Sequence, residues 1–176
     1  MSELFVNQSI SLDQLPRVEE QDFKSIEKRY KVFLHLRNAI FFLVLTIGLL
    51  VFQFLINTDV EFPFWAFVGA YAFIALLWIL SISLVELGFP KKSYIVRQHD
   101  LLYKTGYLMQ KKTAVSKNRI QHVEIRQGIL LRMFRLSKLV IYTAGGNTSD
   151  LSIPGLNPED AEILKEHISL SVSQHE

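Results

Sequence analysis

The sequence contains no cysteine, which excludes both a disulfide framework and a thiolate-ligated metal site. Its five histidines are far apart and lack the spacing of metal ligands, so we expect no metal ion and no other cofactor. No serine lies in a nucleophile-elbow context, and no carboxylates are paired as acid–base catalysis would require. The absence of these groupings predicts that the protein is not an enzyme.

Two long stretches, Ala39 to Ile56 and Phe62 to Val85, contain no Asp, Glu, Lys, Arg or His. A helix needs about 20 apolar residues to cross a bilayer core, so each stretch is predicted to span a membrane. The residues 57–61 between them leave room for only a short turn. We therefore predict an antiparallel transmembrane hairpin over 39–85, with both chain ends on one side. The lack of Asp, Glu, Lys, Arg and His within the spans argues against a pump or proton-coupled transporter that works alone.

Cationic side chains flank the predicted hairpin on both sides, whereas the turn contains two acids. The flanking cations are Lys24, Lys28, Arg29, Lys31 and Arg37 before the first span, and Lys91, Lys92 and Arg97 after the second. The positive-inside rule then places both flanks, and the N- and C-termini with them, in the cytoplasm. We expect residues 1–38 to form a cytoplasmic N-terminal arm. Its first 23 residues are predicted to be mobile or to pair with another chain, and a helical pattern starts at Asp22.

Small residues lie on one face of the second predicted helix. Gly69, Ala72 and Ala75 fall within about 120° of arc, which permits close helix packing. We interpret this face as the contact with the first helix, where Gly48 is a counterpart, and a dimer contact is the alternative. Glu86 follows the second span directly and is expected to pair with Lys91 or Lys92.

After Gly88 and Pro90 the pattern changes to short runs that are typical of antiparallel strands. The predicted strands are Tyr94–Arg97, Leu101–Leu108, Lys111–Val115, Arg119–Arg126, Lys138–Thr143 and Thr148–Ile153. We expect turns at His99-Asp100 and at 144–147, and a helical turn over Ile129–Phe134. Asn157 and Pro158 begin a closing helix with an apolar stripe of Ala161, Ile163 or Leu164, and Ile168. Residues 171–176 are expected to fray. Strands at this spacing predict a small sandwich or barrel.

The order of motifs after the hairpin resembles that of a known family. The motifs are Tyr94-Ile95-Val96, Gly106, Val115, Asn118-Arg119-Ile120-Gln121-His122-Val123, Gln127-Gly128-Ile129-Leu130, Arg132-Met133-Phe134-Arg135-Leu136 and Thr143-Ala144-Gly145-Gly146. This succession resembles the bacterial pleckstrin-homology-like (PH-like, bPH2) membrane proteins of the YdbS type over about residues 20–170.

The resemblance implies a fold and a setting. The expected fold class is a membrane α-helical hairpin (two transmembrane helices) followed by a mainly β PH-like domain at 91–170, with two antiparallel sheets closed by a C-terminal helix. The resemblance implies the inner (cytoplasmic) membrane of a bacterial cell and a partner that is a second PH-like membrane protein. It also suggests a role in envelope stress or antimicrobial resistance, and it supplies no catalytic residues.

Basic residues are the strongest remaining signal for function, since residues 91–149 contain twelve Lys and Arg against Asp100 and Glu124. The candidates for a lipid or partner surface are Lys104, Lys111, Lys112, Lys117, Arg119, Arg132, Arg135 and Lys138. An anionic leaflet attracts such a block, and an ordinary solvated face is the alternative interpretation. Nucleic-acid binding is disfavoured because aromatic residues are not interleaved with the charge and because the domain is tethered to a bilayer.

Taken together, the sequence favours a non-enzymatic integral membrane protein whose PH-like domain docks on a partner membrane protein and contacts anionic lipid. An accessory subunit of a multi-subunit transporter or export system is the alternative.

Overall fold

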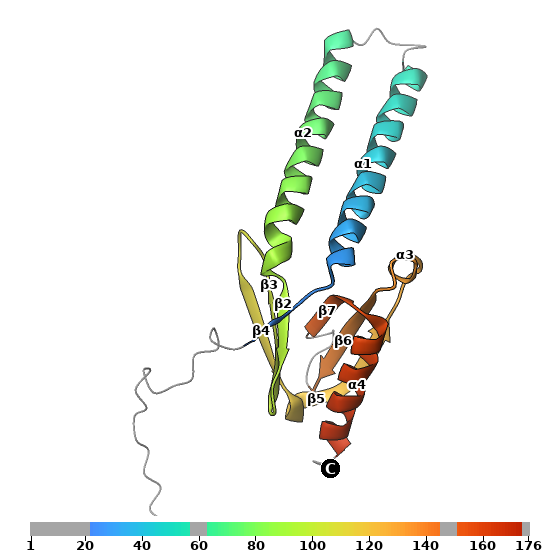
Figure 1. The fold of residues 1–176 in the computed structure, drawn as a ribbon. Coiled ribbons are helices and arrows are strands. Elements are labelled where there is room, and N and C mark those ends of the chain that lie inside the picture. The colour runs from blue at the N-terminus through green and yellow to red at the C-terminus, as the bar shows by residue number, and fades with distance from the viewer. Residues whose placement is uncertain (1–21, 57–62, 145–150, 174–176) are drawn as a thin grey trace, which may run out of the picture.

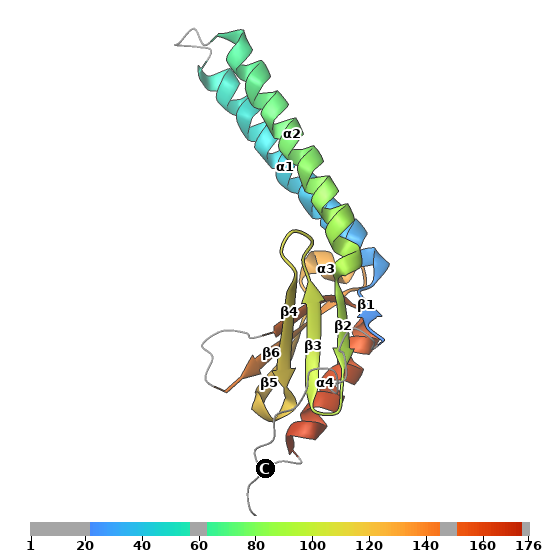
Figure 2. The same ribbon diagram turned by 90° about the vertical axis from the view of Figure 1, so that its left-hand side faces the viewer.

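Two long helices extend from a β-rich head in the computed structural model, which describes residues 22–56, 63–144 and 151–173. Helices α1 (Lys28–Ile56) and α2 (Phe64–Gly88) run side by side, and the head lies at one end of the pair (Figures 1 and 2). Both helices are long and apolar enough to cross a membrane. Large apolar side chains are exposed along them, such as Phe54 and Trp65. A helix that is apolar on its exposed surface is suited to a lipid environment, which agrees with the two predicted spans.

Bulky side chains mediate the contact between the two helices. The rings of Phe42 on α1 and Trp78 on α2 stack with their centroids 6.3 Å apart. The Tyr71 hydroxyl donates a hydrogen bond to Gln53 Oε1 at 3.2 Å. A Cβ atom added to Gly48 or to Gly69 would meet nothing within 4 Å. The expected packing of these glycines against the opposite helix is therefore wrong, because the larger side chains on the neighbouring face make the contact.

The head contains two antiparallel sheets and a closing helix, as predicted. One sheet has the strand order β1 (Lys24–Ser25), β2 (Ser93–Val96), β3 (Asp100–Thr105) and β4 (Lys111–Ser116); the other has β5 (Ile120–Arg126), β6 (Ser137–Thr143) and β7 (Leu151–Leu156). The remaining elements are the 3-10 helices η3 (Phe89–Lys91) and η4 (Lys117–Arg119), the short helix α3 (Ile129–Met133) and the closing helix α4 (Pro158–Ser173). This is the PH-like architecture that the resemblance implied.

Alternating apolar residues of both sheets, together with one face of α4, form the core of the head. Leu101, Leu139, Ile141 and Ile153 are fully buried, and so are Ala161 and Ile168 of α4. The α4 stripe is completed by Leu164, which packs against this core. Ile163, the other candidate for the stripe, is 64% exposed.

The chain before the first span belongs to the same core. Ile26, Tyr30 and Leu34 are buried in the cluster that contains the sheet residues. The helix begins at Lys28 and not near Asp22, because Lys24 and Ser25 pair with Tyr94 and Ser93 as strand β1. The base of α1 and the head are therefore one packed unit.

Local geometry explains two further differences in the strands. Strand β3 ends at Thr105 and not at Leu108, because Gly106 turns the chain with a φ of +96°. Asp100 was predicted to lie in a turn with His99, but it is the first residue of β3, and its carboxylate accepts hydrogen bonds from Arg97. The predicted strand Thr148–Ile153 corresponds to β7, and the part of the prediction that covers residues 145–150 lies outside the described residues.

Candidate functional site

The end of the head from which the helices emerge, called here the helix-proximal end, exposes large apolar side chains. They lie on the turn between β3 and β4 and on α3, which both views place next to the bases of the helices (Figures 1 and 2). Leu108 and Met109 on the turn are 82% and 84% exposed, and Ile129 and Met133 on α3 are 84% and 72% exposed. We call these four residues the apolar tips. Turns that face water are normally polar, so apolar tips indicate a contact with another apolar phase.

The local sequence forces these side chains outward. At the first tip, Gly106 adopts a left-handed conformation in which an added Cβ would collide with the carbonyl oxygen of Met109. At the second tip, on α3, the chain is fixed by the residues that follow the helix. Leu136 is fully buried, and its N–H donates to the Leu131 carbonyl at 2.8 Å. The Gln127 amide donates to the Leu136 carbonyl at 2.9 Å. With both ends of the α3 loop fixed in this way, Ile129 and Met133 remain on its outer side.

Six of the eight predicted surface cations lie close to the apolar tips in the chain. Lys111 and Lys112 begin β4 directly after the first tip, and Lys104 lies opposite Lys112 in the sheet register. Arg132, Arg135 and Lys138 lie on α3, directly after it, and at the start of β6. Like charges placed opposite each other on neighbouring strands repel, so the Lys104–Lys112 pair concentrates positive charge next to the first tip.

The other two predicted cations lie elsewhere. Lys117 and Arg119 belong to η4, between β4 and β5, at the end of the sheets away from the helices (Figure 2). Lys117 is only 4% exposed, and its Nζ lies 3.0 Å from Nε2 of His167 on α4. Lys117 is therefore not part of an exposed surface, because its side chain extends from η4 and packs against α4. Arg119 is exposed but lies far from the apolar tips.

A separate polar cluster lies on the second sheet. The Arg126 guanidinium donates to Glu124 Oε2 at 2.9 Å and to the Tyr142 hydroxyl at 2.7 Å. The bond from Arg126 holds the pKa of the Glu124 carboxyl below its usual value. Since Arg126 is neutralised inside this cluster, it adds little to the charge that an external anion meets.

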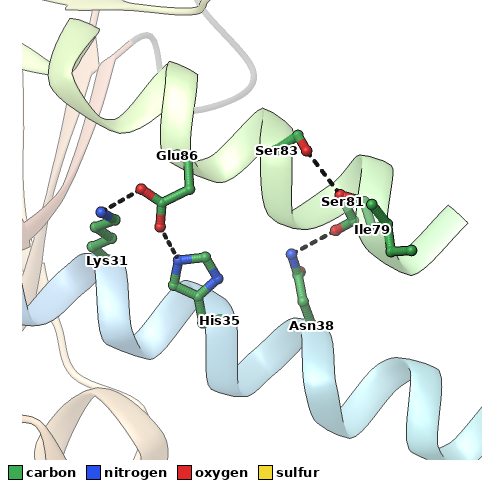
Figure 3. A network of polar contacts seen from close by, with 7 residues as sticks. All are labelled: Lys31, His35, Asn38, Ile79, Ser81, Ser83 and Glu86. Atoms are coloured by element: carbon green, nitrogen blue, oxygen red, sulfur yellow. Dashed lines mark hydrogen bonds and ion pairs between the residues drawn. The ribbon is translucent and has the colours of Figure 1, made fainter. Parts of the chain in front are cut away.

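Polar contacts also join the two helices near the head (Figure 3). Glu86 on α2 forms an ion pair with Lys31 at 2.5 Å and accepts a hydrogen bond from Nε2 of His35 at 3.0 Å, both on α1. One turn further along, the Asn38 amide donates to the Ser81 hydroxyl at 2.6 Å. The expected pairing of Glu86 with Lys91 or Lys92 is therefore wrong, because Glu86 lies on the face of α2 that meets α1.

Sequence reasoning did not identify the apolar tips. Their signal in the sequence is the run Tyr107-Leu108-Met109 between a turn glycine and two lysines, but the sequence pattern places Leu108 at the end of a strand. In the ranges 22–56, 63–144 and 151–173, no three His, Asp or Glu side chains gather in a way that could hold a metal ion.

Two apolar membrane-length helices that share a core with a two-sheet domain define a membrane-anchored PH-like protein. The chain belongs to the bacterial PH domain family, whose model matches residues 32–172. It is 26% identical over 119 residues to the transmembrane protein YdbT of Bacillus subtilis, a match that covers 66% of this chain and 23% of YdbT. It is 31% identical over 98 residues to the transmembrane protein YdbS of the same bacterium, covering 53% of this chain and 60% of YdbS. The chain thus spans less than two thirds of each relative. No solved structure matches it significantly.

Proposed function

We propose that this protein holds its PH-like domain against the cytoplasmic face of a bacterial cell membrane. There the domain contacts anionic lipid and docks a second PH-like membrane protein, and it acts by binding without catalysing a reaction. The observation that carries the proposal is the position of the apolar tips: they lie beside the helix bases, with cations next to them in the chain. Because α1 shares the core of the head, the tips are held close to the bilayer surface.

Lipid contact follows from the chemistry of these groups. Apolar side chains such as Leu108 and Ile129 enter the boundary between headgroups and acyl chains. Each nearby cation adds about 1 kcal/mol of attraction to an anionic leaflet. The cations on both flanks of the hairpin favour the cytoplasmic side, where that leaflet is negatively charged.

Docking of a partner is supported by a face of α2 that α1 leaves uncovered. Gly69, Ala72 and Ala75 are exposed, and Gly69 has open space where a side chain would project. Small residues allow another transmembrane helix to approach closely. A PH-like membrane partner is proposed because two transmembrane proteins of a single bacterium, YdbT and YdbS, both resemble this chain.

The lipid part is tested with the full chain in nanodiscs, because the core of the head includes Ile26, Tyr30 and Leu34. Hydrogen exchange at residues 106–112 and 129–135 is compared between zwitterionic and anionic nanodiscs at low and high salt. We expect slower exchange in the anionic discs and a loss of that difference as salt screens the charges.

Two variants with reduced charge sharpen this test. Lys111→Gln combined with Lys112→Gln should reduce the protection by anionic lipid, whereas Arg119→Gln, at the far end of the head, should leave it unchanged. Exchange at both tips that is the same in all discs and at all salt concentrations would contradict lipid contact.

The docking part is tested by co-expressing the chain with a PH-like membrane protein of the same genome and purifying both in mild detergent. A stoichiometric complex that Gly69→Leu disrupts is expected. A lone monomer would contradict docking, and a stoichiometric polytopic transporter in its place would favour the accessory-subunit alternative.

A further inference from the structure

A groove of about 480 Å³ lies where the base of the helical hairpin meets the turn between β3 and β4. Its cationic side chains are Arg37 from α1 and Lys92, which directly precedes β2. Its apolar wall includes Leu84 from α2 and Leu108 and Met109 from the first apolar tip. The groove therefore joins two positive charges to an apolar surface that continues along a membrane-spanning helix.

The groove lacks an internal counter-charge. Within residues 22–56, 63–144 and 151–173, neither Arg37 nor Lys92 forms an ion pair with a carboxylate. The Lys92 ammonium donates to the Thr105 hydroxyl at 3.1 Å, which is a neutral partner. Burial, and then the positive charge of Arg37, lower the pKa of Lys92. Two cations that repel each other in one groove favour an anion between them.

The groove lies where the two apolar runs end. Arg37 lies two residues before Ala39, where the first apolar run begins. Leu84 lies one residue before Val85, where the second run ends. Where such runs end, hydrocarbon gives way to headgroups. The turn lies close to α2 here, since a Cβ added to Gly88 would lie 3.8 Å from Cβ of Tyr107.

We infer that this groove binds one anionic phospholipid, with its phosphate between Arg37 and Lys92 and an acyl chain along Leu84 and Leu108. Arginine and lysine both form charge-assisted hydrogen bonds to phosphate oxygens. The inference rests on the proposed function, because it needs the head at the membrane surface. The surface cations attract anionic lipid in general, whereas the groove would bind a single lipid molecule at a defined site.

The test uses the full chain in mild detergent and native mass spectrometry. Phosphatidylglycerol is the probe, with phosphatidylcholine and inorganic phosphate as comparisons. We expect one phosphatidylglycerol bound more tightly than phosphatidylcholine. Arg37→Gln combined with Lys92→Gln should weaken it by about tenfold or more. Arg119→Gln combined with Lys165→Gln, which removes the same charge from η4 and α4 outside the groove, should leave it within about twofold of wild type.

A charge-preserving variant separates binding from folding. Arg37→Lys combined with Lys92→Arg should retain most of the affinity. Unchanged binding by the double glutamine variant would overturn the inference, as would displacement of the lipid by millimolar inorganic phosphate. If the groove alone is wrong, the apolar tips remain protected in anionic nanodiscs. If the proposed function is wrong, that protection is absent in wild type as well.

Discussion

Gly155 on β7 and Tyr30 on α1 touch so closely that no side chain fits between them. Gly155 has a φ of +73°, and a Cβ atom added there would lie 2.5 Å from Cγ of Tyr30 and 2.6 Å from Cγ2 of Ile26. The Glu27 N–H also donates to the Gly155 carbonyl at 3.1 Å. This contact joins the base of the hairpin to the head.

Gly155→Ala should therefore loosen the joint. The left-handed backbone alone costs an L-residue about 1–2 kcal/mol, and the collision with Tyr30 adds to it. Denaturant unfolding and limited proteolysis of the full chain should show a less stable head. The matched control is Gly128→Ala, where φ is −69° and an added Cβ meets nothing within 4 Å. Equal stability of the two variants would contradict a tight joint.

Arg135 provides a test that separates stability from binding. It adopts a φ of +52°, although it is not glycine, and it is exposed after α3. Arg135→Gly should leave the unfolding free energy unchanged or raise it by up to about 1 kcal/mol, because glycine accepts this backbone more readily. The same change should weaken the contact with anionic nanodiscs, because it removes a cation. A variant that loses stability and keeps its lipid contact would reverse both expectations.

Lys117 should matter for packing and not for lipid. Lys117→Met keeps the length of the buried side chain but removes its contact with His167. Because His167 is exposed, water can replace that contact, and we expect stability within about 1 kcal/mol of wild type. Lys117→Ala leaves a cavity beside α4 and should cost about 2 kcal/mol. Both are measured by denaturant unfolding. Hydrogen exchange of the apolar tips in anionic nanodiscs should match wild type for Lys117→Met, and a large change there would place Lys117 in the lipid surface.

The ion pair between Lys24 on β1 and Asp160 on α4 predicts a pH dependence at alkaline pH. Its nitrogen–oxygen distance is 2.9 Å, and the hydrogen bond to Asp160 raises the pKa of Lys24 above its usual 10.5. A raised pKa in the folded state gives a stabilisation that is complete below pH 10.5 and is lost as the pH rises through the folded-state pKa. Because Lys24 is mostly exposed, the effect should stay below about 1 kcal/mol. The difference in unfolding free energy between wild type and Lys24→Met should shrink above pH 10.5; a constant difference would contradict the pairing.

The spans and the sheet were predictable because both depend on periodic patterns within short windows. The apolar runs at 39–56 and 62–85 and the alternation around Val123 mark their elements locally. The joint at Gly155 and the pairing of Glu86 with Lys31 were not predictable, because they bring together residues that are far apart in the chain. Of the predicted surface cations, Lys111 and Arg132 lie beside the apolar tips, while Lys117 is buried against α4, which no local pattern reveals. The sequence pattern places Leu108 in a strand and Ile129 and Met133 in a helical turn, so it does not show that these side chains are exposed.

The most direct test of the central claim measures how deeply the apolar tips lie in the bilayer. The chain has no cysteine, so Leu108→Cys, Ile129→Cys and Arg119→Cys each give a single labelling site for an environment-sensitive fluorophore. In anionic nanodiscs, the account predicts that a lipid-attached quencher reaches the labels at 108 and 129, while a water-soluble quencher reaches the label at 119. Labels at 108 and 129 that are quenched only from water, like the one at 119, would contradict it.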